Sequence, residues 1–140
     1  MLAFPLVFAG LAAAIHVYIF ILESVLWVTP RARKVFGTTE EEAQSTRLLA
    51  LNQGYYNLFL AVTTVLGIVL TLGGGALSGA NSGLRAAGLA LLIAGAGSMV
   101  LAGLVLIASD RSKTRSGIVQ LTTPALALLF LGLTWIVTGL

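Results

Sequence analysis

The sequence has no cysteine and few charged residues. Without cysteine, the 140-residue chain cannot form disulfide bonds, thiolate metal sites or cysteine nucleophiles. Charged residues make up only 9% of the chain, against roughly a quarter in a soluble domain, whereas 58% of the residues are hydrophobic. A soluble globular protein is therefore excluded. We predict an all-α, polytopic membrane protein that forms a single domain over residues 1–140.

Four long apolar runs predict an antiparallel bundle of four transmembrane helices, because each run is long enough to cross a bilayer. The third run is dense in glycine and alanine, which indicates close helix packing. Polar or glycine-rich segments separate the runs, and Gly73 to Gly83 predicts a loop. In the first loop, the acidic triplet after Thr38 and Thr39 predicts a short amphipathic helix. We expect the long helices at about residues 3–29, 47–72, 85–108 and 117–139.

The net charge of +3 comes from basic loop residues, which report orientation in the bilayer and do not indicate a nucleic-acid partner. The first and third loops carry most of these residues, and the second has only Arg85. The positive-inside rule then places loops 30–46 and 109–116 in the cytoplasm and both termini outside. The residues counted for the two basic loops are Arg31, Arg33, Lys34 and Arg47, and Arg111, Lys113 and Arg115.

Glu23 is the one charged residue deep inside a predicted span. A carboxylate there costs about 3 kcal/mol on insertion scales unless it is paired, hydrated or protonated. His16 precedes it by seven residues, which on an α-helix is about 10 Å along the axis and within about 20° of the same direction. Trp27 falls on this face too. We predict a stripe facing the protein interior or a wet cavity, with His16 and Glu23 as candidate catalytic residues and Trp27 as a substrate contact.

The second predicted helix carries four hydrogen-bonding side chains at a similar depth, namely Asn52, Gln53, Tyr56 and Asn57. Because the first two helices are antiparallel neighbours, we expect Glu23 to pair with Asn52 or Gln53. By the same argument His16 pairs with Tyr56 or Asn57, and Gly54 permits close approach. Gln120, in the fourth helix, completes the candidate substrate-binding set. Such polar residues can also serve only as interhelical contacts, at about 0.6 kcal/mol per hydrogen bond.

The motifs HVYIFILESVLW, Phe36-Gly37 and LALNQGYYNLFLA resemble the domain-of-unknown-function 1304 family of small bacterial integral membrane proteins. The pair Gln120 and Pro124 is similar to the last helix of that family, and the likeness covers nearly the whole chain. It implies a four-span fold and a multi-pass location in the bacterial inner (cytoplasmic) membrane. It implies no activity.

Three functions remain open at this point. The first is binding or transport of a small lipophilic or cationic molecule, with a proton exchanged at Glu23. The second is a cofactor-free intramembrane isomerase or hydrolase that uses His16 and Glu23 as its acid–base pair. The third is a structural membrane subunit. The expected partners are membrane lipids, a small-molecule ligand and further copies of the chain.

No cofactor or metal is expected. One histidine and one acid do not make a three-ligand zinc site, and the glycine run at Gly73 has no following lysine and so is no phosphate-binding loop. A haem bound to His16 is a minor variant that would show as colour in the purified protein.

Overall fold

The computed structural model describes residues 2–75 and 81–139, and this part of the chain is helical and contains no strand. Four helices are long and apolar enough to cross a membrane. The first consists of α1 (Ala3–Phe20) continued by the π-helix η1 (Ile21–Val25), and the last of the 3₁₀ turn η2 (Arg111–Lys113) followed by α6 (Thr114–Thr138). Between them lie α4 (Arg47–Gly73) and α5 (Ser82–Ser109). The predicted all-α four-helix fold is confirmed, and these helices make the chain a multi-pass membrane protein.

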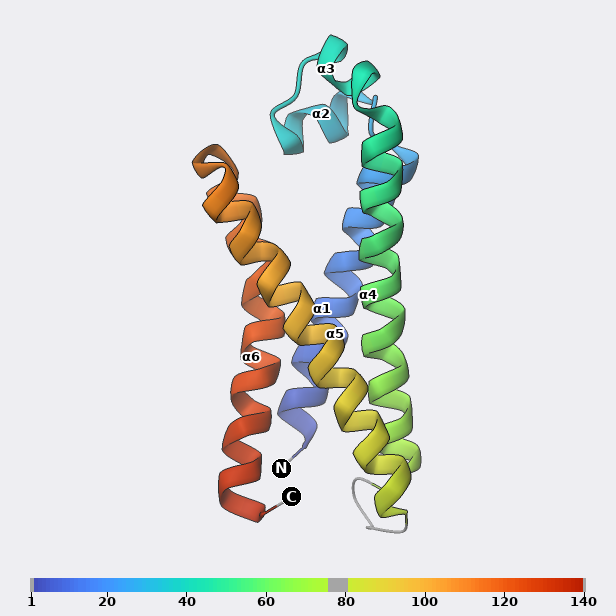
Figure 1. The fold of residues 1–140 in the computed structure, drawn as a ribbon, viewed down its shortest axis with the longest axis vertical. Coiled ribbons are helices and arrows are strands. Elements are labelled where there is room, and N and C mark those ends of the chain that lie inside the picture. Colours follow the sequence, from blue (N-terminus) through green and yellow to red (C-terminus); the bar gives the residue numbers. More distant parts are fainter. Residues whose placement is uncertain (1, 76–80, 140) are drawn as a thin grey trace.

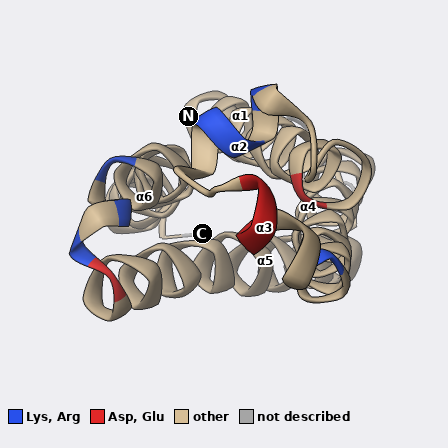
Figure 2. Ribbon diagram, turned by 90° about the horizontal axis from the view of Figure 1, so that it is seen from above, with Lys and Arg blue, Asp and Glu red and all other residues tan. Residues whose placement is uncertain are grey.

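The four long helices form a ring in which each contacts its two neighbours. Helix α1 packs on α4 and α6, and α5 packs on the same two helices, whereas α1 and α5 hardly touch. The view along the bundle shows this arrangement, with α1 opposite α5 (Figure 2). Successive long helices run antiparallel (Figure 1), as expected for short connections.

Helices α4 and α5 approach until their backbones touch, as the small residues of the third span predicted. A Cβ atom on Gly67 would lie 2.6 Å from the backbone nitrogen of Leu92, and one on Gly88 would lie 2.8 Å from the carbonyl oxygen of Gly67. The hydroxyl of Thr71, also buried here, donates to the Gly67 carbonyl at 2.7 Å. Only glycine fits at positions 67 and 88.

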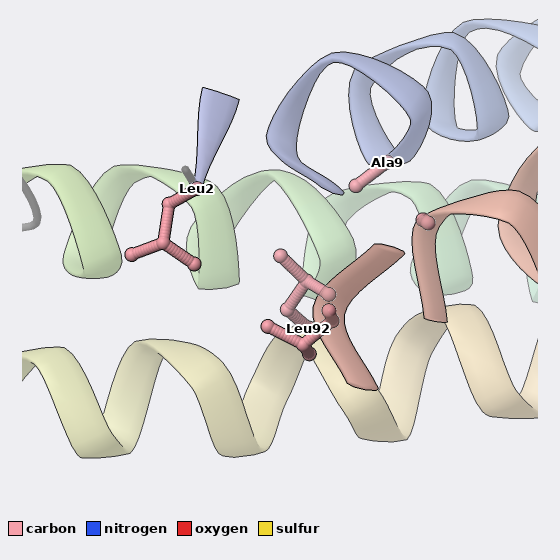
Figure 3. Packing of buried hydrophobic residues seen from close by; sticks show 5 residues of the cluster. Leu2, Ala9 and Leu92 are labelled. Carbon is pink, nitrogen blue, oxygen red and sulfur yellow. The ribbon is translucent and has the colours of Figure 1, made fainter. Parts of the chain in front are cut away.

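The hydrophobic core lies at the end of the bundle where α1 begins and α6 ends. Figure 3 shows Leu2, Ala9 and Leu92 converging there, and Ala127 and Leu131 complete the cluster. The ring of Phe8 stacks on Phe130 at 5.3 Å between centroids. At the opposite end, α5 and α6 lean away from α4 (Figure 1).

The first span ends earlier than predicted, and the loop after it is more ordered. The expected helix 3–29 stops at Val25, because the Leu26 N–H bonds back to the Ile21 carbonyl at 3.0 Å and Leu26 leaves the helical conformation. After it, α2 (Pro30–Phe36) begins with proline at its first position, capped by Thr29. This helix was not predicted. It ends at Gly37, whose φ of 65° is the left-handed conformation that glycine favours.

The predicted short helix at the acidic triplet is confirmed as α3 (Glu40–Ser45). Thr39 forms a capping box with Glu42, since each side chain accepts a hydrogen bond from the backbone N–H of the other. The hydrogen bond from the Thr39 N–H is the main reason why the pKa of Glu42 lies below its ordinary value.

The remaining boundaries shift by a few residues. Helix α5 starts at Ser82 and not at about residue 85, because the Asn81 side chain accepts from the Leu84 N–H at 3.0 Å and caps it. Helix α6 starts at Thr114 and not at 117. Of the predicted glycine-rich loop, Ser78 and Gly79 lie outside the described residues.

Candidate functional site

A cavity of about 670 Å³ lies at the α2 end of the bundle, a size typical of sites for small molecules. Its walls come from α1 and η1 on one side and from the start of α6 on the other, and α2 borders it. The part within the membrane spans is mostly apolar, with Ile15, Ile19, Leu22, Leu106 and Val119 in its lining.

Glu23 lines this cavity from the π-helix η1. The side-chain amide of Asn57 donates to its Oε2 at 2.8 Å. Helix α4 comes this close because Gly54 is buried against η1, where Ser24 donates from Oγ to the Leu51 carbonyl at 3.1 Å. The predicted close approach at Gly54 is therefore confirmed. An acid inside a span thus has an amide partner and a cavity beside it, the setting expected for an intramembrane carboxylate.

The structure does not bring His16 to the same cavity. Its side chain is fully buried, and Nδ1 lies 2.9 Å from the Ala12 carbonyl oxygen. That oxygen can only accept, so Nδ1 carries the proton and Nε2 is the bare nitrogen. Nε2 has no hydrogen-bond partner among the described residues. The prediction of one stripe assumed a regular α-helix, whereas the wider π-turn at Ile21–Val25 changes the direction of Glu23 relative to His16.

The predicted pairings between the first two spans are wrong in detail. Glu23 pairs with Asn57 and not with Asn52 or Gln53, and the His16 ring bonds to its own helix and not to Tyr56 or Asn57. The face of α4 that meets η1 is set by the buried Gly54, and Asn57 is its i+3 neighbour on that face. Asn52 is two residues before Gly54, which turns it about 160° away.

The remaining predicted contacts divide into two groups. Trp27, Gln53 and Gln120 line the cavity, whereas Asn52 and Tyr56 are exposed on α4 and lie outside its lining. The indole N–H of Trp27 donates to the Thr46 hydroxyl at 3.2 Å. Its ring packs on another aromatic ring, Phe36, at 5.1 Å. Both aromatic side chains line the cavity, and these contacts orient the Trp27 ring.

Four cationic side chains in the lining were not predicted as site residues, because sequence reasoning used them only to orient the chain. They are Arg31, Lys34, Lys113 and Arg115. Figure 2 shows the basic residues of α2 facing those at the start of α6 across the end of the bundle. The signal available in the sequence was that both basic loops lie on one predicted side of the membrane, which brings their side chains to one end of the bundle.

Two of these cations are held in place by neighbouring groups. Arg31 donates from Nη2 to the Tyr18 hydroxyl at 3.4 Å, with its guanidinium 6.0 Å from the centre of the Tyr18 ring. The Lys113 ammonium donates to the Phe36 carbonyl. The cavity therefore has an apolar part inside the spans and a cationic part at the end of the bundle.

Metal and haem chemistry find little support in this arrangement. Within residues 2–75 and 81–139, no three side chains of histidine, cysteine or acid gather in a way that could hold a metal ion. The His16 imidazole is enclosed on all sides by protein, which leaves no space beside Nε2 for a haem.

The comparison with protein families identifies the chain's relatives. The model of the family described as "Protein of unknown function (DUF1304)" matches residues 10–132. The match covers most of the chain, and the protein belongs to this family. No curated protein and no solved structure matches the chain.

Proposed function

We propose that the protein binds a small lipophilic molecule in the cavity, with Glu23 as the polar anchor of the site. The observation that carries this proposal is the Glu23 carboxylate, held by Asn57 at 2.8 Å on the wall of a 670 Å³ cavity inside the bundle. Keeping an acid within a membrane span is costly, and such residues commonly mark substrate or proton pathways. An apolar pocket with one placed polar group is also the usual form of a small-molecule site.

Of the two ligand classes that the sequence left open, the cavity favours a lipophilic molecule over a cationic one. Four cationic side chains and one acid line it, so a positive ligand would meet like charges. Exchange of a proton at Glu23 as the ligand enters or leaves remains part of the proposal.

The acid–base alternative has less support. General acid–base catalysis needs both groups within hydrogen-bond reach of the reacting atoms. Glu23 lines the cavity, but His16 is fully buried outside its lining.

Location, orientation and assembly are proposed on the sequence argument alone. We propose a bacterial inner membrane with the α2 end facing the cytoplasm, and an assembly of several copies of the chain. Because the chain has no cysteine, the single substitutions Glu41→Cys and Ser82→Cys, both at exposed positions, would report orientation without background labelling. An impermeant thiol reagent added outside intact cells should label the cysteine at residue 82 alone. The mass of the protein in nanodiscs would give the number of copies.

The two tryptophans allow a direct binding test. Trp27 lines the cavity, whereas Trp135 is 55% exposed near the other end of the bundle. In phosphatidylcholine nanodiscs, Trp135→Phe leaves Trp27 as the reporter, and Trp27→Phe leaves Trp135 as a control for partition into the bilayer. The probe is 2-bromododecanol, whose bromine quenches indole fluorescence on contact. We expect saturable quenching of Trp27 and only gradual, unsaturated quenching of Trp135. Identical quenching curves for the two reporters would contradict binding in the cavity.

Glu23→Gln in the Trp135→Phe background tests the anchor. We expect half-saturation by 2-bromododecanol to move to a several-fold higher concentration, because the amide cannot reproduce the carboxylate's hydrogen bonding. Unchanged binding and unchanged stability in this variant would favour a structural subunit in which the polar cluster only fixes helix packing.

A further inference from the structure

We infer that the cavity selects amphiphiles with an anionic head and a hydrocarbon chain. The head, a carboxylate or a phosphate, would lie among the cationic side chains, and the chain would extend along the apolar wall inside the spans. This inference rests on the proposed binding function and adds the class of ligand.

The first argument is the separation of polarity along the cavity. Arg31 and Lys34 come from α2, which follows the first span, and Lys113 and Arg115 come from the first residues of the last one. These four side chains therefore belong to the end of the bundle. Apolar side chains of the lining such as Ile15 lie further inside the first span. An amphiphile matches this arrangement at both of its ends.

The second argument is that, within the described part of the chain, no acid forms an ion pair with a cation of the lining. Among the described residues one ion pair is formed, between Arg33 and Glu40 at 3.2 Å, and neither residue lines the cavity. Asp110 accepts a hydrogen bond from the Ser112 N–H at 2.8 Å, and its pKa is lowered first by the Ser112 side chain and then by this N–H. The charge of Lys113 contributes to that lowering, as it does at the capped Glu42. Lys113 is thus partly compensated by acids outside the lining.

Lys34 and Arg115 are the two cations best placed to hold an anion. Both line the cavity, and neither has an ion-pair partner within the described part of the chain. The positive-inside rule accounts for basic residues at this end of the bundle, but it does not require their side chains to line a cavity. An arginine fork also matches the planar geometry of a carboxylate or the oxygens of a phosphate.

The negative charge of Glu23 is compatible with an anionic ligand in the same cavity. Glu23 belongs to the π-helix within the first span, whereas α2 and its cations follow that span. Its Oε2 already accepts from Asn57. The Glu23 carboxylate thus already has a hydrogen-bond donor, and the anionic head is attracted by the four cations that line the same cavity.

The test compares two probes that differ only in the head. These are 2-bromododecanoate, an acid ionised at neutral pH because of its bromine, and the uncharged 2-bromododecanol. Both place bromine beside the head, near Trp27, in the Trp135→Phe protein in phosphatidylcholine nanodiscs. We expect the anion to reach half-saturation at a concentration at least about tenfold lower than the alcohol. The reason is that a charge-assisted hydrogen bond is stronger than a neutral one by a free energy that corresponds to about a tenfold change in Kd.

Two double variants, each of which removes two positive charges, test which cations cause the preference for the anionic probe. Lys34→Gln with Arg115→Gln removes two cations from the lining, and Arg47→Gln with Arg111→Gln removes two exposed cations outside it. We expect the first pair to abolish the preference for the anion and the second to retain it. Partition of each probe into the bilayer is common to all variants, so the comparison isolates the site.

The possible results separate this inference from the function on which it rests. Equal binding of the two probes would leave the binding function standing and overturn the selectivity. Absence of binding by both probes would refute both proposals. Retained preference in the Lys34 and Arg115 variant would show that these cations do not select the ligand. Bromoacetate, which has the head without the chain, should not quench Trp27 in the same concentration range, and equal quenching would indicate a site for free anions.

Discussion

The contact between Gly54 and the π-helix can be tested by adding one methyl group. A Cβ atom at Gly54 would collide with Oγ of Ser24, and it would lie 3.1 Å from both the Ser24 backbone nitrogen and Cβ of Glu23. The serine side chain is short and the other two atoms cannot rotate away. We therefore expect Gly54→Ala to push η1 off α4.

The expected cost combines overpacking with lost hydrogen bonds. Overpacking in a close contact costs about 1–3 kcal/mol. Displacement of η1 also weakens the bond from Ser24 to Leu51 and the bond from Asn57 to Glu23, each about 0.6 kcal/mol on average in membranes. The better helix propensity of alanine returns about 1 kcal/mol. The net prediction is a loss of about 1–3 kcal/mol in the free energy of unfolding.

Unfolding by increasing mole fraction of SDS, followed by circular dichroism, measures this difference. Gly97→Ala is the matched control, because a Cβ there meets nothing within 4 Å, so this variant should be neutral or more stable by up to about 1 kcal/mol. Gly54→Ala should also weaken binding of 2-bromododecanol, whereas Gly97→Ala should not. Equal stability of the two variants would refute the argument that this contact positions Glu23.

Three further changes have defined outcomes. His16→Leu should leave stability unchanged or raise it, by up to about 1–3 kcal/mol in SDS unfolding, because it removes a buried nitrogen that lacks a partner; a clear loss would show that the packing of the ring and its bond to Ala12 outweigh this cost. Asn57→Leu should cost about 1–2 kcal/mol because it leaves the intramembrane carboxylate without its amide donor, whereas Asn52→Leu on the exposed face should cost almost nothing. The third change concerns Glu42, whose pKa is lowered from 4.5 mainly by the Thr39 N–H. Its contribution to α3 is complete above that ordinary value and is lost as pH falls through the lower folded-state pKa. The protection factors of the α3 amides, which are corrected for the slower intrinsic exchange at low pH, should therefore fall on acidification in the native protein, with this fall absent in Glu42→Gln.

The spans were predictable because length and apolar composition fix them independently of tertiary contacts. The end of the first span was not, because no residue type signals a π-turn. The irregularity at Ile21–Val25 is stabilised by packing on Gly54, which lies on another helix. A pattern of seven residues between His16 and Glu23 then predicts a shared face that the real backbone does not provide.

The same limit explains the partner of Glu23. The motif LNQGYYN correctly indicated amide side chains opposite the acid. It could not indicate which amide, because the rotation of α4 about its axis depends on which residue meets η1. Once Gly54 is known to be the contact, Asn57 follows as its i+3 neighbour, and Asn52 and Tyr56 face outward. Glycine in such a motif therefore gives the orientation that the polar residues themselves leave open.

Glycine contacts also explain why the cavity lies where it does. At the α2 end, α4 is joined tightly to η1 through Gly54, and α5 is joined tightly to α6, where a Cβ on Gly103 would lie 2.7 Å from Cβ of Leu121. At the opposite end, the Phe8–Phe130 stack and the Leu92 cluster tie the two pairs together. Two rigid pairs joined at one end must diverge at the other unless side chains fill the space. Cations from α2 and from the start of the last span line the cavity at this end. Like charges therefore oppose its closure, and an anion between them would favour it.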